Sequence, residues 1–283
     1  ENGVWIRTKT AADEREFLVD VTDTDRLFRG AHGVCDLTKP ADGASIQLEV
    51  THDGGTSWRQ LGQGQNVEPI AFDRADPEVL YGSDCNLAIS TTSGNTWKHI
   101  DPIPNYALSE LEIVDDRLLL LGTTLAGGSR LLEVDIADPH EPEVGDVLLD
   151  VPGSASFDAR DDHIVVGTAD TMHLSVDNGL TWATSKVGLE SVTAPVASPD
   201  AQRPDGATAN NDVGILTVKL GPKAGRLYAG TPHGLYISQD DGTTWVRYDE
   251  VSSNARVTAI QFGLGGADLY VTTDAGVVVI PAP

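Results

Sequence analysis

Short apolar runs separated by glycine and polar turns repeat along the chain, and they predict its secondary structure. Three such runs, at residues 79–81, 164–166 and 227–229, each end at a glycine. Each glycine lies eight residues before a serine and 15 residues before a tryptophan in all three places. Apolar runs of this length, bounded by turn residues, are typical of strands. The ungapped match therefore predicts a repeating unit of strand, loop, strand, turn and strand.

An octet with the pattern S/T-x-D-x-G-x-T/S-W follows the third strand in four places. The copies occupy residues 51–58, 90–97, 175–182 and 238–245, and Thr92 replaces the Asp in the second copy. An Asp that begins a tight turn accepts hydrogen bonds from the amides after it, and Gly adopts the positive φ that closes the turn. Each octet is thus predicted to be a hairpin tip, with its Trp packed against a neighbouring sheet. The structural positions are Asp53, Trp58, Trp97, Asp177, Trp182, Asp240, Gly242 and Trp245.

The octets and apolar runs divide the chain into six units. They are expected at residues 16–61, 67–100, 108–149, 155–187, 192–248 and 257–280. The first is expected to have strands at residues 16–21, 25–28 and 46–50. The third has strands at 111–114, 117–121 and 130–134 but no octet. Residues 197–212, rich in Pro, Asp, Asn and Ala, indicate an inserted surface loop in the fifth unit.

The sixth unit lacks a fourth strand, and the N-terminal segment is expected to supply it. Residues 2–7 match residues 242–247 with one residue deleted, so that Trp5 takes the place of Trp245. We therefore predict an all-β fold, a six-bladed β-propeller in a single domain over residues 1–283, in which residues 2–8 close the last blade. Closure removes exposed sheet edges. Seven blades are the alternative, if the 63-residue step from Trp182 to Trp245 contains a further sheet.

The charge of the chain excludes some partners. With 43 acidic and 19 basic residues, the net charge is −24, so the surface is expected to repel nucleic acid and anionic membranes. No apolar run reaches the roughly 18 residues of a membrane helix, so no membrane insertion is expected. A monomer in an extracellular, cell-surface or periplasmic location is expected, from which a signal or anchor has been removed.

The candidate ligand-binding residues lie in loops that follow the second strands, on the face of a propeller where ligands usually bind near the channel. They are His32, Asp36, Asp84, Asn86, Asp170, His233 and Asp274. A ring of carboxylates with two histidines could bind a cation, or a cationic or sugar ligand. The alternative is that these are ordinary loop residues. No metal-ligand spacing is present, so neither a metal nor a cofactor is expected.

Cys35 and Cys85, the two cysteines of the chain, both fall in these loops on neighbouring predicted blades. We predict a disulfide that clamps the long first loop, which would indicate export from the cytosol. The alternative is a pair of small buried thiols.

The octets resemble the Asp-box (BNR) repeat of sialidase-like β-propellers. Sialidases with this repeat need an arginine triad, a Tyr–Glu nucleophile pair, an Asp acid and a Phe-Arg-Ile-Pro motif. Here residues 28–30 read Phe-Arg-Gly, and the arginines Arg74, Arg117, Arg160 and Arg226 fall in turns on the octet side. The resemblance also covers non-catalytic propellers, namely photosystem-assembly factors and sortilin-type receptors.

The predicted function is a non-catalytic binding or scaffold propeller that recognises a protein or glycan through its channel face. No catalytic residue is predicted. The alternative is a glycoside hydrolase of sialidase-like fold, which would need two carboxylates about 5 to 10 Å apart across a cleft.

Overall fold

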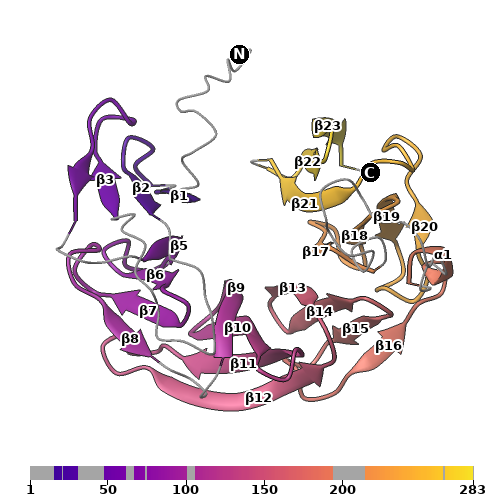
Figure 1. Ribbon diagram of the computed structural model, residues 1–283, viewed down its shortest axis with the longest axis horizontal. Helices are drawn as coiled ribbons and strands as arrows, with labels where there is room; N and C mark the ends of the chain where they lie inside the picture. Colours follow the sequence, from indigo (N-terminus) through magenta and orange to yellow (C-terminus); the bar gives the residue numbers. More distant parts are fainter. Residues whose placement is uncertain are drawn as a thin grey trace. The chain divides into compact units, whose positions relative to one another are not determined.

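The protein is all-β in the computed structural model, which describes residues 16–20, 22–30, 48–61, 67–73, 75–100, 106–193, 214–263 and 265–282 (Figure 1). Within these residues, six antiparallel sheets are arranged as the blades of a β-propeller, and the single helix is α1 (Glu190–Thr193). The predicted fold class and the six blades are confirmed, and the described residues contain no seventh sheet.

The first two sheets each have four strands in chain order. The first contains β1 (Glu16–Val19), β2 (Leu27–Gly30), β3 (Glu49–Thr51) and β4 (Arg59–Gln60), and the second contains β5 (Glu68–Phe72), β6 (Leu80–Ser83), β7 (Leu87–Ser90) and β8 (Lys98–Ile100). Phe28 and Leu48 from the first sheet pack with Leu80, Ala88 and Trp97 from the second. The core of this part therefore lies between the faces of consecutive sheets.

The second strand of the first sheet begins two residues later than the sequence predicts, at Leu27 rather than residue 25. A turn occupies the intervening residues. The Arg26 amide donates to the Asp23 carbonyl over 2.8 Å, and the Asp25 amide donates to the Asp23 carboxylate over 3.2 Å. These hydrogen bonds satisfy the backbone amides within the turn, so the strand begins only after it.

The third sheet has longer strands than predicted. Its order is β12-β11-β10-β9, with β9 (Tyr106–Val114), β10 (Arg117–Thr124), β11 (Ser129–Asp135) and β12 (Glu143–Val151). Asp115, at a φ of 53°, forms the tight turn between β9 and β10. This sheet has no octet, and its two edge strands, β9 and β12, are each nine residues long.

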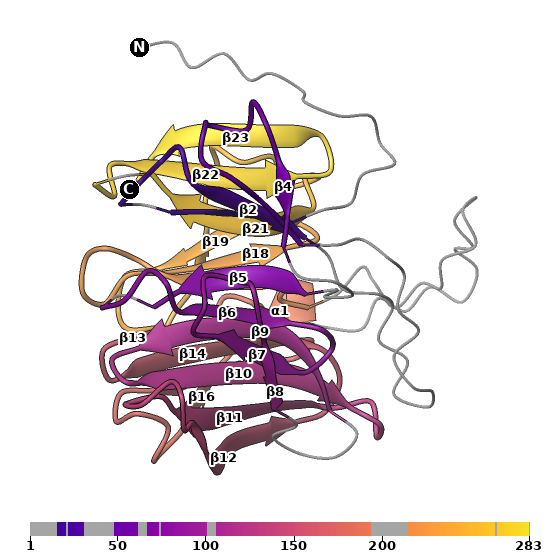
Figure 2. The ribbon, with the colours of Figure 1, turned by 90° about the vertical axis from the view of Figure 1, so that its left-hand side faces the viewer.

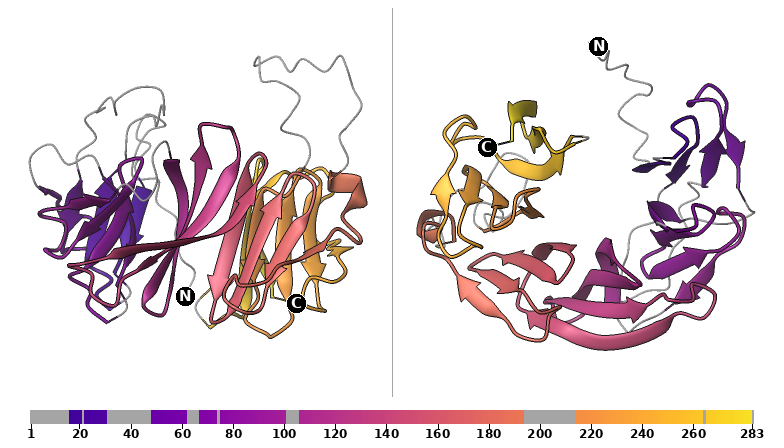
Figure 3. Two further views of the ribbon diagram at one scale, coloured as in Figure 1. Left: turned by 90° about the horizontal axis from the view of Figure 1, so that it is seen from below. Right: turned by 180° about the vertical axis from the view of Figure 1, so that it is seen from behind.

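The fourth and fifth sheets match the predicted units. The fourth contains β13 (Ala155–Arg160), β14 (His163–Thr168), β15 (Met172–Ser175) and β16 (Ala183–Ser185), and the fifth contains β17 (Thr217–Leu220), β18 (Leu227–Thr231), β19 (Gly234–Ser238) and β20 (Val246–Arg247). Their strands alternate in direction (Figure 3, left). The central strands β18 and β19 are buried throughout, because neighbouring blades cover both of their faces.

The start of the fifth unit differs from the prediction. The sequence places it at Val192, but Val192 lies in the helix α1, and the first strand, β17, begins at Thr217. Residues 194–213, which include the predicted inserted loop, lie outside the described residues. Val192 is nevertheless buried with Leu189 and Trp245, so the helix anchors the chain against the fifth sheet.

The sixth sheet has three strands, β21 (Val257–Phe262), β22 (Asp268–Thr273) and β23 (Gly276–Pro281) (Figure 2). β23 is the last strand among the described residues. Residues 2–8, which are predicted to complete this sheet, lie outside the described residues, so the closure stays a prediction.

The chain divides into two compact units, one of residues 1–111 and 136–144, the other of residues 112–135 and 145–283. In the second unit, three buried clusters each join two consecutive sheets: the third with the fourth, the fourth with the fifth, and the fifth with the sixth. The single-domain organisation stays a prediction. None of the described residues forms a helix with the length and apolar character needed to cross a membrane.

Candidate functional site

Asp84 and Asn86 lie together in the loop between β6 and β7. The Asn86 amide donates to the Asp84 carboxylate over 3.4 Å, and Cys85 between them has a φ of 84°. The second Asp84 oxygen lies 2.8 Å from Nδ1 of His99, on β8, and this hydrogen bond raises the pKa of His99. The Oδ1 atom of Asn86 is buried and accepts no hydrogen bond within the described part of the chain. The Asp84 carboxylate of this loop is therefore already hydrogen-bonded, whereas the Asn86 Oδ1 atom remains available as an acceptor among the described residues.

Asp170, His233 and Asp274 each lie in the tight turn after a second strand, as predicted. Asp170 accepts a hydrogen bond from the Thr168 hydroxyl over 3.0 Å, and the His233 amide donates to the Thr231 hydroxyl over 3.0 Å. The Asp274 carboxylate accepts from the Arg256 amide over 3.1 Å. No hydrogen bond or ion pair joins any two of these three residues, all of which are described.

The predicted ring of ligands is only partly visible. His32 and Asp36 lie outside the described residues. Across the described residues, no three His, Cys, Asp or Glu side chains come together in a way that could hold a metal ion. Cation binding by the predicted loop residues stays a prediction.

Cys85 is disulfide-bonded. Cys35, its predicted partner, lies outside the described residues. The Cys85 carbonyl accepts a hydrogen bond from the Leu108 amide over 2.8 Å, which ties this loop to the start of β9.

The octet aspartates are occupied by their own turns. In the fifth sheet, Oδ1 of Asp240 accepts from the Thr244 amide over 2.9 Å and from the Ser238 hydroxyl over 2.8 Å, and Oδ2 accepts from the Thr244 hydroxyl over 2.6 Å. Asp53 and Asp177 accept the equivalent three hydrogen bonds within their own octets. Hydrogen bonds from the side chain and amide of Ser57 lower the pKa of Asp53 to about 2. These carboxylates stabilise the turn and have little capacity left for a substrate.

The octet glycines and tryptophans position each turn against the preceding blade. Gly242 has a φ of 77°, and a Cβ there would lie 2.8 Å from the side chain of Leu174 on β15. The indole Nε1 of Trp245 donates to the Gly242 carbonyl over 3.0 Å, and Trp97 makes the equivalent bond to Gly94. Trp97 and Trp245 are buried, whereas Trp58 and Trp182 are half-buried.

A cluster of three charged residues lies on the first strands of three consecutive blades. Glu112 is on β9, Asp158 on β13 and Lys219 on β17, and first strands line the central channel of a propeller. The Lys219 ammonium lies 2.5 Å from Oδ1 of Asp158 and 3.2 Å from Oε1 of Glu112. Oδ2 of Asp158 also accepts from the Leu220 amide over 2.7 Å. We call Glu112, Asp158 and Lys219 the channel cluster.

Burial and mutual contact shift the pKa values of two residues of the channel cluster. Burial, reinforced by Asp158 and opposed by Lys219, raises the pKa of Glu112 to about 7. Burial opposes the charge of Lys219, but the Asp158 and Glu112 carboxylates outweigh it and raise the Lys219 pKa. Glu112 is therefore the group of this cluster that titrates near neutral pH.

The geometry of the channel cluster does not suit glycoside hydrolysis. Both carboxyl groups contact one ammonium, and the nearby Asp158 carboxylate contributes to the raised pKa of Glu112. Glycosidases instead place their two carboxyl groups about 5 to 10 Å apart, with the sugar or a water between them. Asp158 is also buried, and each of its oxygens accepts a hydrogen bond. The cluster joins three blades and exposes part of Glu112 and Lys219.

The sequence did not predict the channel cluster, because its residues lie in first strands rather than in the loops where ligands usually bind. The available signal was weak: Asp158 and Lys219 are charged residues that directly follow the apolar Phe157 and Val218 within predicted units. Which charges would meet could not be read from the sequence, since Glu112 and Lys219 are 107 residues apart.

Comparison with known proteins supports the fold. No family model matches the chain, and no curated protein matches it. Among solved structures, a GH74 enzyme of Niastella koreensis has a TM-score of 0.58 at 15% identity over 94% of this chain. This chain spans 43% of that enzyme's length.

Two further neighbours are YCF48 propellers. A structure described as YCF48 bound to D1 peptide has a TM-score of 0.59 at 14% identity, over 92% of this chain and 76% of that one. YCF48 from Cyanidioschyzon merolae has a TM-score of 0.54 at 14% identity, over 91% of this chain and 77% of that one. At these identities the likeness concerns the fold alone.

Proposed function

We propose that this chain is a non-catalytic binding or scaffold propeller that recognises a protein or glycan through its channel face. The channel cluster carries this proposal. The charged side chains that the described first strands bring together neutralise one another, and Asp158 is held by Lys219 and by the Leu220 amide. A carboxylate in that state is a structural group rather than a nucleophile or a base.

Each compact unit has polar groups that remain available to a ligand. Glu112 and Lys219 are partly exposed, and the buried Oδ1 of Asn86 accepts no hydrogen bond within the described residues. A buried acceptor without a donor is costly, so a bound water or ligand would stabilise it. Among the fold neighbours, one YCF48 structure is described as bound to a peptide, which is the kind of binding proposed here.

The resemblance of the octets to Asp-box repeats is consistent with either a binding protein or an enzyme, and the arginines favour the former. The Arg117 side chain donates to Glu133 over 3.1 Å and to Asn178 over 2.6 Å, and Arg160 donates to the Gly221 carbonyl over 2.6 Å. Arginines engaged in these turns do not form a triad for a substrate carboxylate.

The alternative function is a glycoside hydrolase of sialidase-like fold. The observation that favours it is the pKa of Glu112, which at about 7 lies where a general acid works best. GH74 enzymes are among the fold neighbours, and this chain spans less than half of the one from Niastella koreensis. A partner carboxylate at hydrolytic distance would then have to come from outside the described residues.

Export from the cytosol is part of the proposal. The disulfide at Cys85 supports it, because disulfides persist in oxidising compartments. The net charge of −24 supports it less directly, by keeping the surface soluble and free of nucleic acid.

One experiment separates the two functions. Labelled protein is applied to glycan and peptide arrays, and the same glycans are assayed for release of new reducing ends. We expect binding without hydrolysis, and weaker binding for His233→Ala on the channel face. The matched control, Asp161→Asn in the turn between β13 and β14, should bind as the wild type does.

Two results would overturn the proposed function. Hydrolysis that is lost in Glu112→Gln would establish the alternative enzyme. No binding to either array, or binding that His233→Ala and Asp161→Asn reduce equally, would remove the channel face as the recognition surface.

A further inference from the structure

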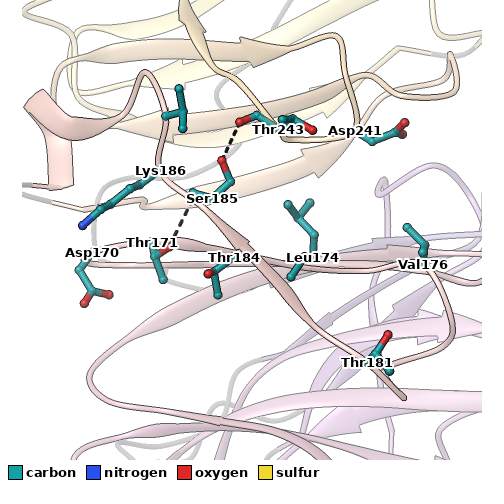
Figure 4. Close-up of a pocket in the computed structure, with 12 residues that line it drawn as sticks. Asp170, Thr171, Leu174, Val176, Thr181, Thr184, Ser185, Lys186, Asp241 and Thr243 are labelled. Atoms are coloured by element: carbon teal, nitrogen blue, oxygen red, sulfur yellow. Dashed lines mark hydrogen bonds between the residues drawn. The ribbon is translucent and has the colours of Figure 1, made fainter.

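A groove runs along β16, the outer strand of the fourth sheet, beside the octet turn of the fifth sheet. It has a volume of about 720 Å³ and lies entirely within the second compact unit. Figure 4 shows Asp170 and Lys186 at one end, Val176 and Thr181 at the other, and Asp241 with Thr243 on the opposite wall. The volume is in the range of known ligand sites. We call it the β16 groove.

The walls of the β16 groove are fixed by hydrogen bonds between the two blades. The Ser185 hydroxyl donates to the Thr243 carbonyl over 2.8 Å, and the Trp245 amide donates to the Val187 carbonyl over 2.9 Å. The Thr171 hydroxyl donates to the Ser185 carbonyl over 3.3 Å. The groove is therefore preformed, and a ligand would not have to order its walls.

One wall of the groove is a free sheet edge. The strand order β13-β14-β15-β16 leaves β16 with β15 on one side, and no described strand pairs with the other side. An exposed edge strand presents unpaired amides and carbonyls to an incoming extended chain. Addition of such a strand is a common mode of peptide recognition, with affinity from main-chain hydrogen bonds.

The octet turn that borders the groove is apolar at two positions where the other octets are polar. Val176, which lines the groove, is 57% exposed, and Leu180, which precedes the lining residue Thr181 in the same turn, is 82% exposed. The residues at the position of Val176 in the other three octets are His52, Thr91 and Gln239, and those at the position of Leu180 are Thr56, Asn95 and Thr243. The octet turn does not require these apolar side chains, since the other copies form without them. Two exposed apolar side chains in one turn beside a groove provide apolar surface for a partner to cover.

The charges of the groove indicate the chemistry of that partner. Two carboxylates, Asp170 and Asp241, and one ammonium, Lys186, line it, and none of the three forms an ion pair among the described residues. The groove therefore has an acidic excess on a protein of net charge −24, which favours a basic ligand.

From the edge, the apolar rim and the acidic excess we infer that the β16 groove binds an extended, basic peptide segment of a partner protein, which pairs with β16. Apolar side chains of the peptide lie on Val176 and Leu180, and basic side chains lie near Asp170 and Asp241. One end of the groove, with Asp170 and Thr171, belongs to a loop of the channel face, whereas β16 and the octet turns that form the rest of the groove do not.

A random dodecapeptide library displayed on phage, selected on the wild-type protein, tests the inference. The enriched sequences are made as synthetic peptides and measured by calorimetry and by hydrogen–deuterium exchange. We expect basic residues around alternating apolar residues, and slower exchange of the amides of residues 183–187. Because pairing and rim contacts both contribute, Val176→Thr with Leu180→Thr should weaken binding about tenfold or more.

The control is Val246→Thr, an exposed valine on β20 that does not line the groove. It should leave the affinity unchanged, as should His233→Ala on the channel face. The inference is overturned if no peptide is enriched, if the double variant binds as tightly as the wild type, or if protection falls on another segment such as β23.

Discussion

The fifth and sixth sheets show how one strand pattern acquires two different environments. In both, a Thr hydroxyl closes the turn before the third strand: Thr231 donates to the Gly234 carbonyl, and Thr273 donates to the Gly276 carbonyl. On β19, Leu235, Tyr236 and Ile237 are 0%, 6% and 6% exposed. On β23, Val277, Val278 and Val279 at the equivalent positions are 60%, 36% and 54% exposed.

The difference arises after the third strand of each sheet. The fifth sheet continues through an octet turn into β20. Trp245 of that turn packs with Met172 of the fourth sheet and with Leu189. The sixth sheet ends at β23, and no described strand covers its edge. Apolar strands of this kind are therefore stabilised by the fourth strand and its tryptophan, rather than by their own composition.

Loss of the buried octet tryptophan should have the largest effect. Trp245→Ala removes a side chain that is 3% exposed, together with its hydrogen bond to Gly242. We expect the free energy of unfolding to fall by about 3 to 5 kcal/mol, measured by urea denaturation. The half-buried Trp58 is the control, and Trp58→Ala should cost clearly less. Equal losses would show that burial of the octet tryptophan is not what stabilises the sheet.

The predicted completion of the sixth sheet should have the next largest effect. The sequence match assigns Trp5 the position of Trp245, so Trp5→Ala should lower the free energy of unfolding by about 2 to 4 kcal/mol in the same assay. Val279→Asp should also destabilise the protein, because a covered strand does not tolerate a charge. If both variants unfold within about 0.5 kcal/mol of the wild type, as exposed positions do, residues 2–8 do not complete this sheet.

The channel cluster predicts a pH dependence. Because the folded pKa of Glu112 is about 7, above its ordinary value of 4.5, the folded state holds a proton there that the unfolded state releases. The contribution of Glu112 to the stability of the fold is therefore complete below pH 4.5 and is lost as pH rises through about 7. Thermal melts from pH 4.5 to 7.5 should show that wild-type stability falls relative to Glu112→Gln, in which Gln imitates the protonated acid.

Comparison with Glu112→Gln is needed because histidines titrate in the same range. The pKa of His99 is raised and that of His173 is lowered, so their effects on stability have opposite signs. Both remain in the variant and cancel in the difference. A wild-type curve parallel to that of Glu112→Gln would show that Glu112 does not hold the proton.

The octet aspartates should have the smallest effect, at acid pH. Hydrogen bonds from Thr244 lower the pKa of Asp240, so its stabilisation is present above pH 3.8 and is lost as pH falls through the folded pKa. Asp240→Asn should melt below the wild type at pH 6, with the gap narrowing towards pH 2. Thr92→Val, in the octet without an Asp, should show a gap that does not change with pH.

Much of the fold was readable from the sequence because it depends on local chemistry. The octets place Asp, Gly and Ser or Thr at the spacing that a hydrogen-bonded turn needs, and the apolar runs before them form strands within a few residues of the predicted bounds. Four octets and six groups of apolar runs were enough to predict six blades. The main errors, at Leu27 and at the start of β17, arose where a polar turn or a helix took residues that looked able to extend a strand.

The candidate sites were much less predictable. The sequence identified Asp84, Asn86, Asp170, His233 and Asp274 as loop residues, and they are, but it could not show that three of their carboxylates are already hydrogen-bonded, to His99, Thr168 and the Arg256 amide. It contained Glu112, Asp158 and Lys219 without indicating that they meet. It contained Val176 and Leu180 without indicating that they border a free strand edge.

The sequence by itself determined the turns, the strand periodicity and the number of blades, since each of these depends on residues within a few positions of one another. Only the tertiary structure decided which charges share a proton, which apolar strand is covered and where a groove opens between two sheets. Those properties depend on side chains brought together from different blades, and electrostatic coupling and burial follow distance in space rather than distance along the chain.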